Sequence, residues 1–383
     1  MNPGSLLLEE DPIQATTRLI MLLISCCPVA LALEQVVEIK PTWQKTRTAW
    51  PDTSNQVRSM ISTDGGLYVG TSGTIARSAQ VWRLVDGGWT KQAEFKSLKA
   101  AVLQVDADGN LYVGTGTPHS AETRGRGAAE VWRIDAKGSR TRLRAFPQQD
   151  IAYSMAWFQG KLHVGTMTED IRGRAELWRF DDPGWTQLAG QGVPGWPEDN
   201  NYAGVYEMWT DGSALIAGMF SRTMGDGDVL KLVGNRWVDL RAPESHYALC
   251  FVSYRGRLVV SLSNLGAKYH NPVFALQKDG TWQPLGKAPA EWEGAYIPNH
   301  MIVYRDVLYL GVGGKRGTLS VWKYDGGSWT KLAGDGLNGS WVDPLVSRGA
   351  EWVYRLSFHK GKLYAGLASD RSPFQAQVWA MSP

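Results

Sequence analysis

One four-residue motif recurs along this chain and constrains its fold more than any other feature. The motif is Leu, two mostly apolar residues and then Gly or Ser, and its copies begin at Leu67, Leu111, Leu162, Leu215, Leu258, Leu308 and Leu363. The copies lie roughly 43 to 55 residues apart. Most are rich in β-branched or aromatic residues, which is typical of a short strand. The chain therefore repeats one β-structured unit.

Each repeat contains further strand-like segments around the motif. Between Lys161 and Leu188 the segments LHVG, AELWRF and GWTQL are each closed by Gly, Asp or Pro, and the apolar segment Tyr153 to Phe158 precedes them. Repeats of this length with about four strands each are typical of propeller blades. We therefore predict an all-β fold, a seven-bladed β-propeller of four-stranded antiparallel blades, as a single domain over residues 33–383.

The seventh repeat ends early and lacks a fourth strand. Its last strand-like segment is Val378 to Met381. The segment Pro41 to Lys45 has the fourth-strand pattern, with Trp43 where GWTQL has Trp185, and it precedes the first repeat. We predict that this N-terminal strand completes the last blade, because closure removes the open edge between the first and last blades.

Most of the 18 Trp residues occupy two fixed places in the repeat. One place follows Val or Leu, at Trp82, Trp132, Trp178, Trp322 and Trp379. The other follows Gly, Thr, Ser or Arg, at Trp89, Trp185, Trp237, Trp282 and Trp329. Recurrence at fixed places favours packing between adjacent blades over contact with a ligand.

These motifs resemble those of kelch-like propellers. In kelch repeats a third strand ending in Tyr-Asp is followed by a turn and a Trp, as in Val321 to Asp325 with Trp329. The repeats are still more similar to those of many secreted bacterial proteins, which read LYVGT, EVWRYDG and WTQL. The resemblance covers Val36 to Pro383 and implies the fold, but no particular function. The chain departs from kelch in having a single Gly in the second strand, as at Gly70 and Gly165, where kelch repeats have a pair.

The N-terminus has the pattern of a signal peptide. Arg18 precedes an apolar segment that ends at Ala30-Leu31-Ala32, an A-x-A cleavage signal. We predict that residues 1–32 are removed and that the protein is secreted or periplasmic. The alternative is an outer-membrane-type lipoprotein, because Leu23 to Cys26 resembles a lipobox whose Cys26 would carry a lipid anchor. No other stretch approaches about 18 apolar residues, so no membrane span is predicted.

Composition and motif searches argue against several classes of function. The balance of 40 Lys and Arg against 37 Asp and Glu gives no general basis for binding nucleic acid or a membrane surface. After cleavage only Cys250 remains, in the apolar segment LCFV, and we interpret it as a core residue. The sequence has no HExxH, CxxCH, GxSxG or phosphate-loop motif, and its 6 His show no metal-ligand spacing. Asp106 to Asn110 resembles the start of a calcium loop without the later Glu, and we interpret it as a turn. We therefore predict no catalytic residue, metal or cofactor.

The two ends of the predicted ring differ in loop length. Within each predicted blade, the turns that join strand 1 to strand 2 and strand 3 to strand 4 are tight, and they lie at one end of the ring. The loops that join strand 2 to strand 3 and the connections between blades lie at the other end, and all the long loops are among them. Long loops on a rigid scaffold are a usual place for a binding site. Basic residues occur in every second-to-third loop, at Arg77, Arg124, Arg126, Arg172, Arg174, Arg222, Lys268, Lys315, Arg316 and Arg371. A positive rim of this kind suits an anionic ligand or an acidic protein loop. Acidic residues in the same loops are the alternative partners of these cations.

A second group of polar residues recurs at one position near the start of the first strand of the predicted blades, which we call the inner strand. Its members are Arg58, Tyr153, Tyr206, Asn299 and Tyr354, and one step along lie Ser154, Glu207, His300 and Arg355. These side chains would either line the mouth of the central channel or pack in the blade cores with only their polar tips in water.

Two hypotheses of function follow. The first is an exported, non-catalytic propeller that binds a glycan, an anionic small molecule or a protein partner through its long-loop end, alone or as a subunit of a larger complex. The second is a carbohydrate-active enzyme, a hydrolase, lyase or mutarotase, with acid and base drawn from Glu207, His246, Tyr269, His270, His300, Asp343 or Glu351. We prefer the first, because the chemical signal is diffuse. The candidate ligand-binding residues are Arg58, Arg124, Arg172, Tyr206, Glu207, Arg222, His300, Arg316, Tyr354, Arg355 and Arg371.

Overall fold

The computed structural model describes most of the repeat region. The described residues are 43–46, 54–73, 79–117, 129–168, 174–190, 192–193, 195–197, 202–222, 227–263, 271–292, 296–314, 319–334, 351–369 and 376–382. The predicted signal peptide, residues 1–32 with Cys26, lies outside them.

The described residues form β-strands and one short 3-10 turn, η1 (Ala290–Trp292), so the all-β prediction is confirmed. The strands are β1 (Trp43–Lys45), β2 (Ser54–Thr63), β3 (Gly66–Gly73), β4 (Ala79–Val85), β5 (Gly88–Phe95), β6 (Lys99–Val105), β7 (Leu111–Gly116), β8 (Ala129–Ile134), β9 (Arg140–Phe146), β10 (Ile151–Phe158), β11 (Lys161–Met167), β12 (Leu177–Phe180), β13 (Trp185–Ala189) and β14 (Tyr202–Thr210). They continue as β15 (Leu215–Ser221), β16 (Val229–Val233), β17 (Arg236–Asp239), β18 (Tyr247–Tyr254), β19 (Arg257–Ser263), β20 (Val273–Leu276), β21 (Trp282–Pro284), β22 (Tyr296–Tyr304), β23 (Val307–Gly314), β24 (Ser320–Tyr324), β25 (Trp329–Gly334), β26 (Trp352–His359), β27 (Lys362–Ala368) and β28 (Gln377–Met381).

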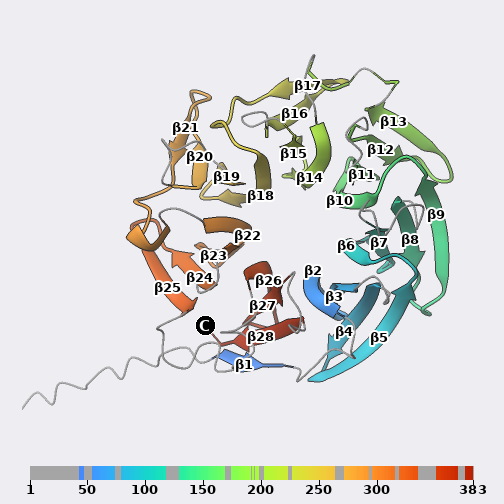
Figure 1. The fold of residues 1–383 in the computed structure, drawn as a ribbon, viewed down its shortest axis with the longest axis horizontal. Coiled ribbons are helices and arrows are strands. Elements are labelled where there is room, and N and C mark those ends of the chain that lie inside the picture. The colour runs from blue at the N-terminus through green and yellow to red at the C-terminus, as the bar shows by residue number, and fades with distance from the viewer. Residues whose placement is uncertain are drawn as a thin grey trace, which may run out of the picture. The chain divides into compact units, whose positions relative to one another are not determined.

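Consecutive strands pair antiparallel in sets that are arranged around a central axis (Figure 1). In the first set β2 pairs with β3, β3 with β4 and β4 with β5, and the same order repeats from β6, β10, β14, β18 and β22. The strands that begin the sets, β2, β6, β10, β14, β18, β22 and β26, lie nearest the axis in Figure 1 and are called the inner strands below.

Neighbouring sets join through single residue pairs. These are Ser72 with Lys99, Gly116 with Ile151, Met167 with Gly204, Phe220 with Tyr247, Gly313 with Trp352 and Gln56 with Ala368. Strands β19 and β22 pack against each other without such a pair among the described residues. The hydrogen-bonded sheet is therefore not closed into a continuous ring.

Strand β1 lies at the outer side of the last set. It pairs antiparallel with β28, so that Trp43 faces Met381 and Lys45 faces Trp379 (Figure 1). Trp43 is only 4% exposed and packs in one hydrophobic cluster with Trp379 and Leu363. The N-terminal strand thus supplies an aromatic side chain to the core of the C-terminal set.

The indole of Trp43 also makes a hydrogen bond that recurs elsewhere. Its Nε1 donates to the carbonyl oxygen of Leu332 in the neighbouring set, at 3.3 Å. Trp282 and Trp329 donate in the same way to the preceding set, at 2.8 Å to Leu240 and 3.0 Å to Leu285. Trp43 therefore makes the same indole-to-carbonyl hydrogen bond with the preceding set as the Trp of the fourth strand makes in two other sets.

The Trp residues of the third strands have a different, equally regular partner. Each indole Nε1 donates to the side chain two residues earlier, on the same face of its strand. The pairs are Trp82 with Gln80, Trp132 with Glu130, Trp178 with Glu176, Trp322 with Ser320 and Trp379 with Gln377, at 2.9 to 3.0 Å. A buried indole N–H needs such an acceptor, so the repeated sequence favours one orientation of the ring.

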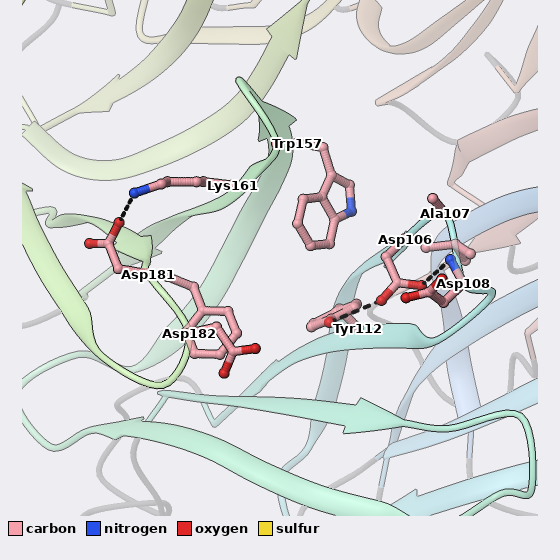
Figure 2. A pocket seen from close by; sticks show the side chains of 11 residues that line it. Asp106, Ala107, Asp108, Tyr112, Trp157, Lys161, Asp181 and Asp182 are labelled. Carbon is pink, nitrogen blue, oxygen red and sulfur yellow. Dashed lines mark hydrogen bonds and ion pairs between the residues drawn. The ribbon is translucent and has the colours of Figure 1, made fainter.

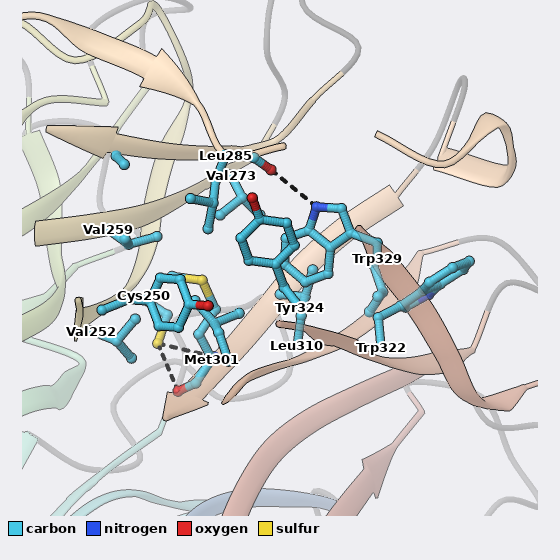
Figure 3. Packing of buried hydrophobic residues seen from close by; sticks show 14 of the residues in the cluster. Cys250, Val252, Val259, Val273, Leu285, Met301, Leu310, Trp322, Tyr324 and Trp329 are labelled. Atoms are coloured by element: carbon cyan, nitrogen blue, oxygen red, sulfur yellow. Dashed lines mark hydrogen bonds between the residues drawn. The ribbon is translucent and has the colours of Figure 1, made fainter. Parts of the chain in front are cut away.

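The cores form mainly between sets, as one cluster shows (Figure 3). Val259 and Val273 of one set pack with Leu310 and Trp322 of the next. Burying side chains of this size stabilises the fold by about 1.5 to 3 kcal/mol each. This packing accounts for the recurrence of apolar residues at fixed places in the repeat.

The single Gly of the recurring motif lies where two sets approach most closely. A Cβ on Gly165 would be 2.5 Å from both Ser154 Oγ and Val205 Cβ. A Cβ on Gly70 would be 2.2 Å from Ser59 Oγ and 2.7 Å from the carbonyl oxygen of Ala100 in the next set. At these two positions any side chain would clash with the same set's inner strand or with that of the next set, whereas the fifth copy of the motif has Ser261 at this place.

Candidate functional site: the central pocket

Each inner strand contains a β-bulge at the same place in its register. The register with the second strand shifts across Val57/Ser59, Ala100/Val102, Ala152/Ser154, Val205/Glu207, Ala248/Cys250, Pro298/His300 and Val353/Arg355. The extra residues are Arg58, Ala101, Tyr153, Tyr206, Leu249, Asn299 and Tyr354, which we call the bulge ring. A bulge re-aims a side chain relative to the sheet, and here it directs one residue of every inner strand toward the axis.

A pocket of about 470 Å³ lies over the bulge ring. Every inner strand contributes to it, and β11, β15 and β19 add side chains at their C-terminal ends. Its lining is Gln56, Arg58, Lys99, Tyr153, Met167, Tyr206, Phe220, Tyr247, Leu249, Ser263, Ile297, Asn299, Trp352 and Tyr354. It therefore lies at the end of the ring to which the sequence assigns the long loops.

Tyr354 is the centre of a hydrogen-bond network at the axis. Its hydroxyl lies 2.9 Å from that of Tyr153 and 3.2 Å from that of Tyr206, and Arg58 Nη1 donates to the same oxygen. Burial alone would raise the pKa of Tyr354, but Arg58 and Arg355 outweigh it and hold the pKa below its usual value. Burial raises the pKa of Tyr153 and Tyr206, so these two hydroxyls are the natural donors to Tyr354.

The charged residues in the described lining of the pocket are all basic. Arg58 and Lys99 line it, and none of the lining residues within the described part of the chain is acidic. Arg58 is 9% exposed, and its guanidinium lies over the Tyr354 ring, 4.5 Å from the centroid. Cations in such a partly desolvated place favour an anion over a neutral group.

Asn299 brings an unsatisfied donor to the same pocket. It is 5% exposed, and its amide Nδ2 has no hydrogen-bond partner among the residues that the structure describes. Leaving a buried donor unpaired costs about 1 to 3 kcal/mol. An acceptor atom on a bound molecule would recover that cost.

The residues that directly follow the bulge ring in the inner strands form a second layer. Ser59, Ser154, Cys250 and His300 each bond the backbone of the next inner strand, to Ala100 O, Val205 O, Met301 N and Leu356 N. Burial, with Glu207 as a lesser cause, raises the pKa of the Cys250 thiol to about 12. These residues hold neighbouring sets together, and none of them lines the pocket.

Glu207 and Arg355 form the charged part of this layer. Arg355 Nη2 lies 3.9 Å from Glu207 Oε2, and the two side chains are 8% and 24% exposed. Burial raises the pKa of Glu207 from its ordinary value of 4.5 to about 7, although Arg355 opposes the shift. Burial and the nearby Arg355 lower the pKa of His300 well below its usual value.

We predict that Glu207 makes stability fall as pH rises. Because its pKa is raised in the folded state, the folded chain binds more protons than the unfolded chain between about pH 4.5 and 7. Glu207 alone should lower the free energy of unfolding by about 2 kcal/mol from pH 5 to 7.5. The lowered pKa of His300 acts in the opposite direction in both proteins, so urea titrations at both pH values should show the wild type losing about 2 kcal/mol of stability relative to Glu207→Gln. An equal pH dependence in both proteins would contradict the assignment.

Sequence reasoning located part of this arrangement. Arg58, Tyr206 and Tyr354 line the pocket, whereas Glu207, His300 and Arg355 lie in the second layer. Arg222 is not part of the lining, and its Nη2 donates to Thr168 O of the neighbouring set at 2.8 Å. The candidates outside the described residues are Arg124, Arg172, Arg316 and Arg371.

Several lining residues were missed by sequence reasoning. Gln56, Tyr247, Ile297 and Trp352 each lie two residues before a bulge-ring residue. Residues two apart share a face of a strand, so the two-residue period was a signal that could have found them.

A larger pocket, of about 680 Å³, lies at the tight-turn end of the ring (Figure 2). Two of the four Asp side chains in its lining accept hydrogen bonds from nearby residues. Asp106 accepts bonds from Asp108 N, Asn110 N, Asn110 Nδ2 and Tyr112 Oη, and Asp181 accepts from Lys161, Arg179 and Thr186. The Asp106 to Asn110 segment is thus a carboxylate-capped turn. With four Asp against one Lys in its lining, this pocket disfavours an anion.

No group of His, Cys, Asp or Glu suited to a metal ion occurs within the described ranges. In the same part of the chain, no helix has both the length and the apolar character that crossing a membrane requires.

Comparison with known proteins shows the fold. No protein-family model and no curated protein matches the sequence. The chain is similar in structure to the extracellular domain of the hybrid two-component system BT4673 from B. thetaiotaomicron, with a TM-score of 0.59 and 9% identity over 88% of this chain, which spans 39% of that one. It is also similar to the β-propeller domain of the Trilobed protease from Pyrococcus furiosus (TM-score 0.51, 9% identity, 85% and 95% of the two chains). The WD40 β-propeller domain of Doa1 gives a TM-score of 0.50 at 11% identity, over 88% and 96%. The chain has a β-propeller fold.

Proposed function

We propose that this chain is an exported β-propeller that binds a small anionic ligand in its central pocket without transforming it. In this proposal the propeller has seven four-stranded blades, and β1 completes the last of them. The pairing of β1 with β28 and the Trp43 bond to Leu332 support that arrangement. The A-x-A pattern before Leu33 supports export.

One observation carries the proposed activity. The pocket combines two cations, no acidic lining residue in the described chain, and the unsatisfied amide donor of Asn299. Donors and positive charge that converge on one cavity complement the oxygens of a carboxylate. A volume of about 470 Å³ is in the range of small-molecule sites.

The catalytic alternative has less support. Glu207 and His300 lie below the pocket in the second layer, and His300 Nδ1 already accepts the N–H of Leu356. Glu351 accepts a bond from Ser369 at 3.5 Å. His246 is described and does not line the pocket.

The sequence also predicts basic loops at the same end, and these lie outside the described residues. In this proposal Arg124, Arg172, Arg316 and Arg371 contribute to holding a glycan or an acidic protein partner. Charge reversal at Arg124, Arg172 or Arg371 is expected to weaken that contact.

Carboxylate probes test the central pocket directly. We expect at least one of benzoate, glucuronate and 3-phenylpropanoate to raise the melting temperature at constant ionic strength, because a ligand that binds only the folded state stabilises it. Arg58→Gln and Lys99→Gln should each abolish most of that rise. The exposed Lys137→Gln is the matched control and should retain it. The proposal fails if no carboxylate binds, or if both pocket variants respond as the wild type does.

A further inference from the structure

The central pocket has two chemically different sides. Arg58 and Lys99 come from β2 and β6, which are neighbouring inner strands. Phe220 and Tyr247 come from β15 and β18, in the sets that Figure 1 shows across the axis from β2. A ligand that fills the pocket must therefore meet a cationic side and an apolar side at once.

The apolar side is built around a pair of aromatic rings that pack on each other. The rings of Phe220 and Tyr247 are stacked with their centroids 4.6 Å apart and their planes 2° from parallel. Met167 and Leu249 belong to the same hydrophobic cluster, and Ile297 packs against it. Each ring covers one face of the other, so a ligand can use only their outer faces and edges, and an aromatic group gains contact area and ring packing there.

The polar atoms on this side of the pocket are hydroxyl groups. Among the described lining residues from β14 to β19 they belong to Tyr206, Tyr247 and Ser263, and the Tyr206 hydroxyl already lies 3.2 Å from that of Tyr354. A sugar ring packed on Phe220 or Leu249 would face carbon atoms, and each of its hydroxyls left unpaired there costs about 1 to 3 kcal/mol.

We propose that the ligand is a carboxylic acid with an aromatic body, such as an arylalkanoic acid. This inference rests on the proposed function of the pocket and names its ligand class. The carboxylate accepts hydrogen bonds from Arg58, Lys99 and Asn299 Nδ2, and the aryl group packs on Phe220 and Tyr247.

Three probes separate this class from others. They are 3-phenylpropanoate, its neutral isostere 3-phenylpropanamide, and glucuronate, each titrated into the full mature chain by calorimetry. We expect 3-phenylpropanoate to bind at least about tenfold more tightly than either of the other two, because each of them lacks one of the two complementary parts. In Phe220→Ala, affinity for 3-phenylpropanoate should fall about tenfold, while the exposed Val238→Ala should leave it unchanged.

The outcomes distinguish the ligand class from the proposed function. If glucuronate binds as tightly as 3-phenylpropanoate, or Phe220→Ala leaves the affinity for 3-phenylpropanoate unchanged, the aromatic class is wrong and the anion site stands. If 3-phenylpropanamide binds as tightly as 3-phenylpropanoate, or no carboxylate binds, the anion site fails as well. The comparison of probes on the wild type decides the question even if Phe220→Ala does not fold.

Discussion

Replacing Trp43 with alanine is expected to lower the free energy of unfolding by about 3 to 5 kcal/mol, the usual cost of removing a buried Trp. Trp43 is 4% exposed, packs with Trp379 and donates to Leu332 O at 3.3 Å. Its loss leaves a cavity in the last set and breaks a contact to the preceding one. Deleting Leu33 to Lys45 should cost more, because β28 then becomes an open edge that can pair with other chains.

Thermal and urea unfolding of residues 33–383 measure this effect. Gln44→Ala is the matched control, since Gln44 lies in the same strand and is exposed. It should change the free energy of unfolding by less than about 0.5 kcal/mol. If the deletion leaves the melting temperature unchanged and the protein monomeric, the last set does not need its N-terminal strand.

Gly165→Val is expected to destabilise the chain by about 3 kcal/mol, at the upper end of the usual cost of overpacking. A Cβ at Gly165 already meets Ser154 Oγ and Val205 Cβ at 2.5 Å. Strand β14, the inner strand of the next set, must move away from β11 to make room for the valine side chain. Tyr206 lies in β14 and moves with it. We therefore expect weaker carboxylate binding in addition to lower stability.

Gly184→Val is the control for this substitution. A Cβ at Gly184 meets nothing within 4 Å. Urea unfolding should place Gly184→Val near the wild type and Gly165→Val well below it. Equal stability of the two variants would show that the sets are not packed as closely as described.

The repeated strands could be predicted from the sequence because their signal is local. A Leu, β-branched or aromatic residues and a flanking turn occur within a few positions of each other, and the pattern recurs, as at Leu67 and Leu162. The N-terminal fourth strand followed from the same pattern, and the structure pairs Trp43 with Met381. The single Gly of the motif was visible as well, but its reason, the approach of Val205 to Gly165, lies 40 residues further along the chain.

The pocket could be predicted only in part because it depends on register. The sequence grouped Arg58 with Tyr354 by their place in the repeat, yet a bulge is a relation between two strands and leaves no mark in one of them. Ala101 and Leu249 occupy the same place without any polar signal. The partner of Arg222, Thr168 O, belongs to a different set, which no local pattern indicates.

The most direct test of the central claim is a crystal structure of residues 33–383 grown with 3-phenylpropanoate. The account predicts one bound molecule in the central pocket, with its carboxylate within hydrogen-bond distance of Arg58 and Asn299 Nδ2. A central pocket without the probe, with the molecule bound instead beside Trp157 in the pocket of Figure 2, would contradict the account.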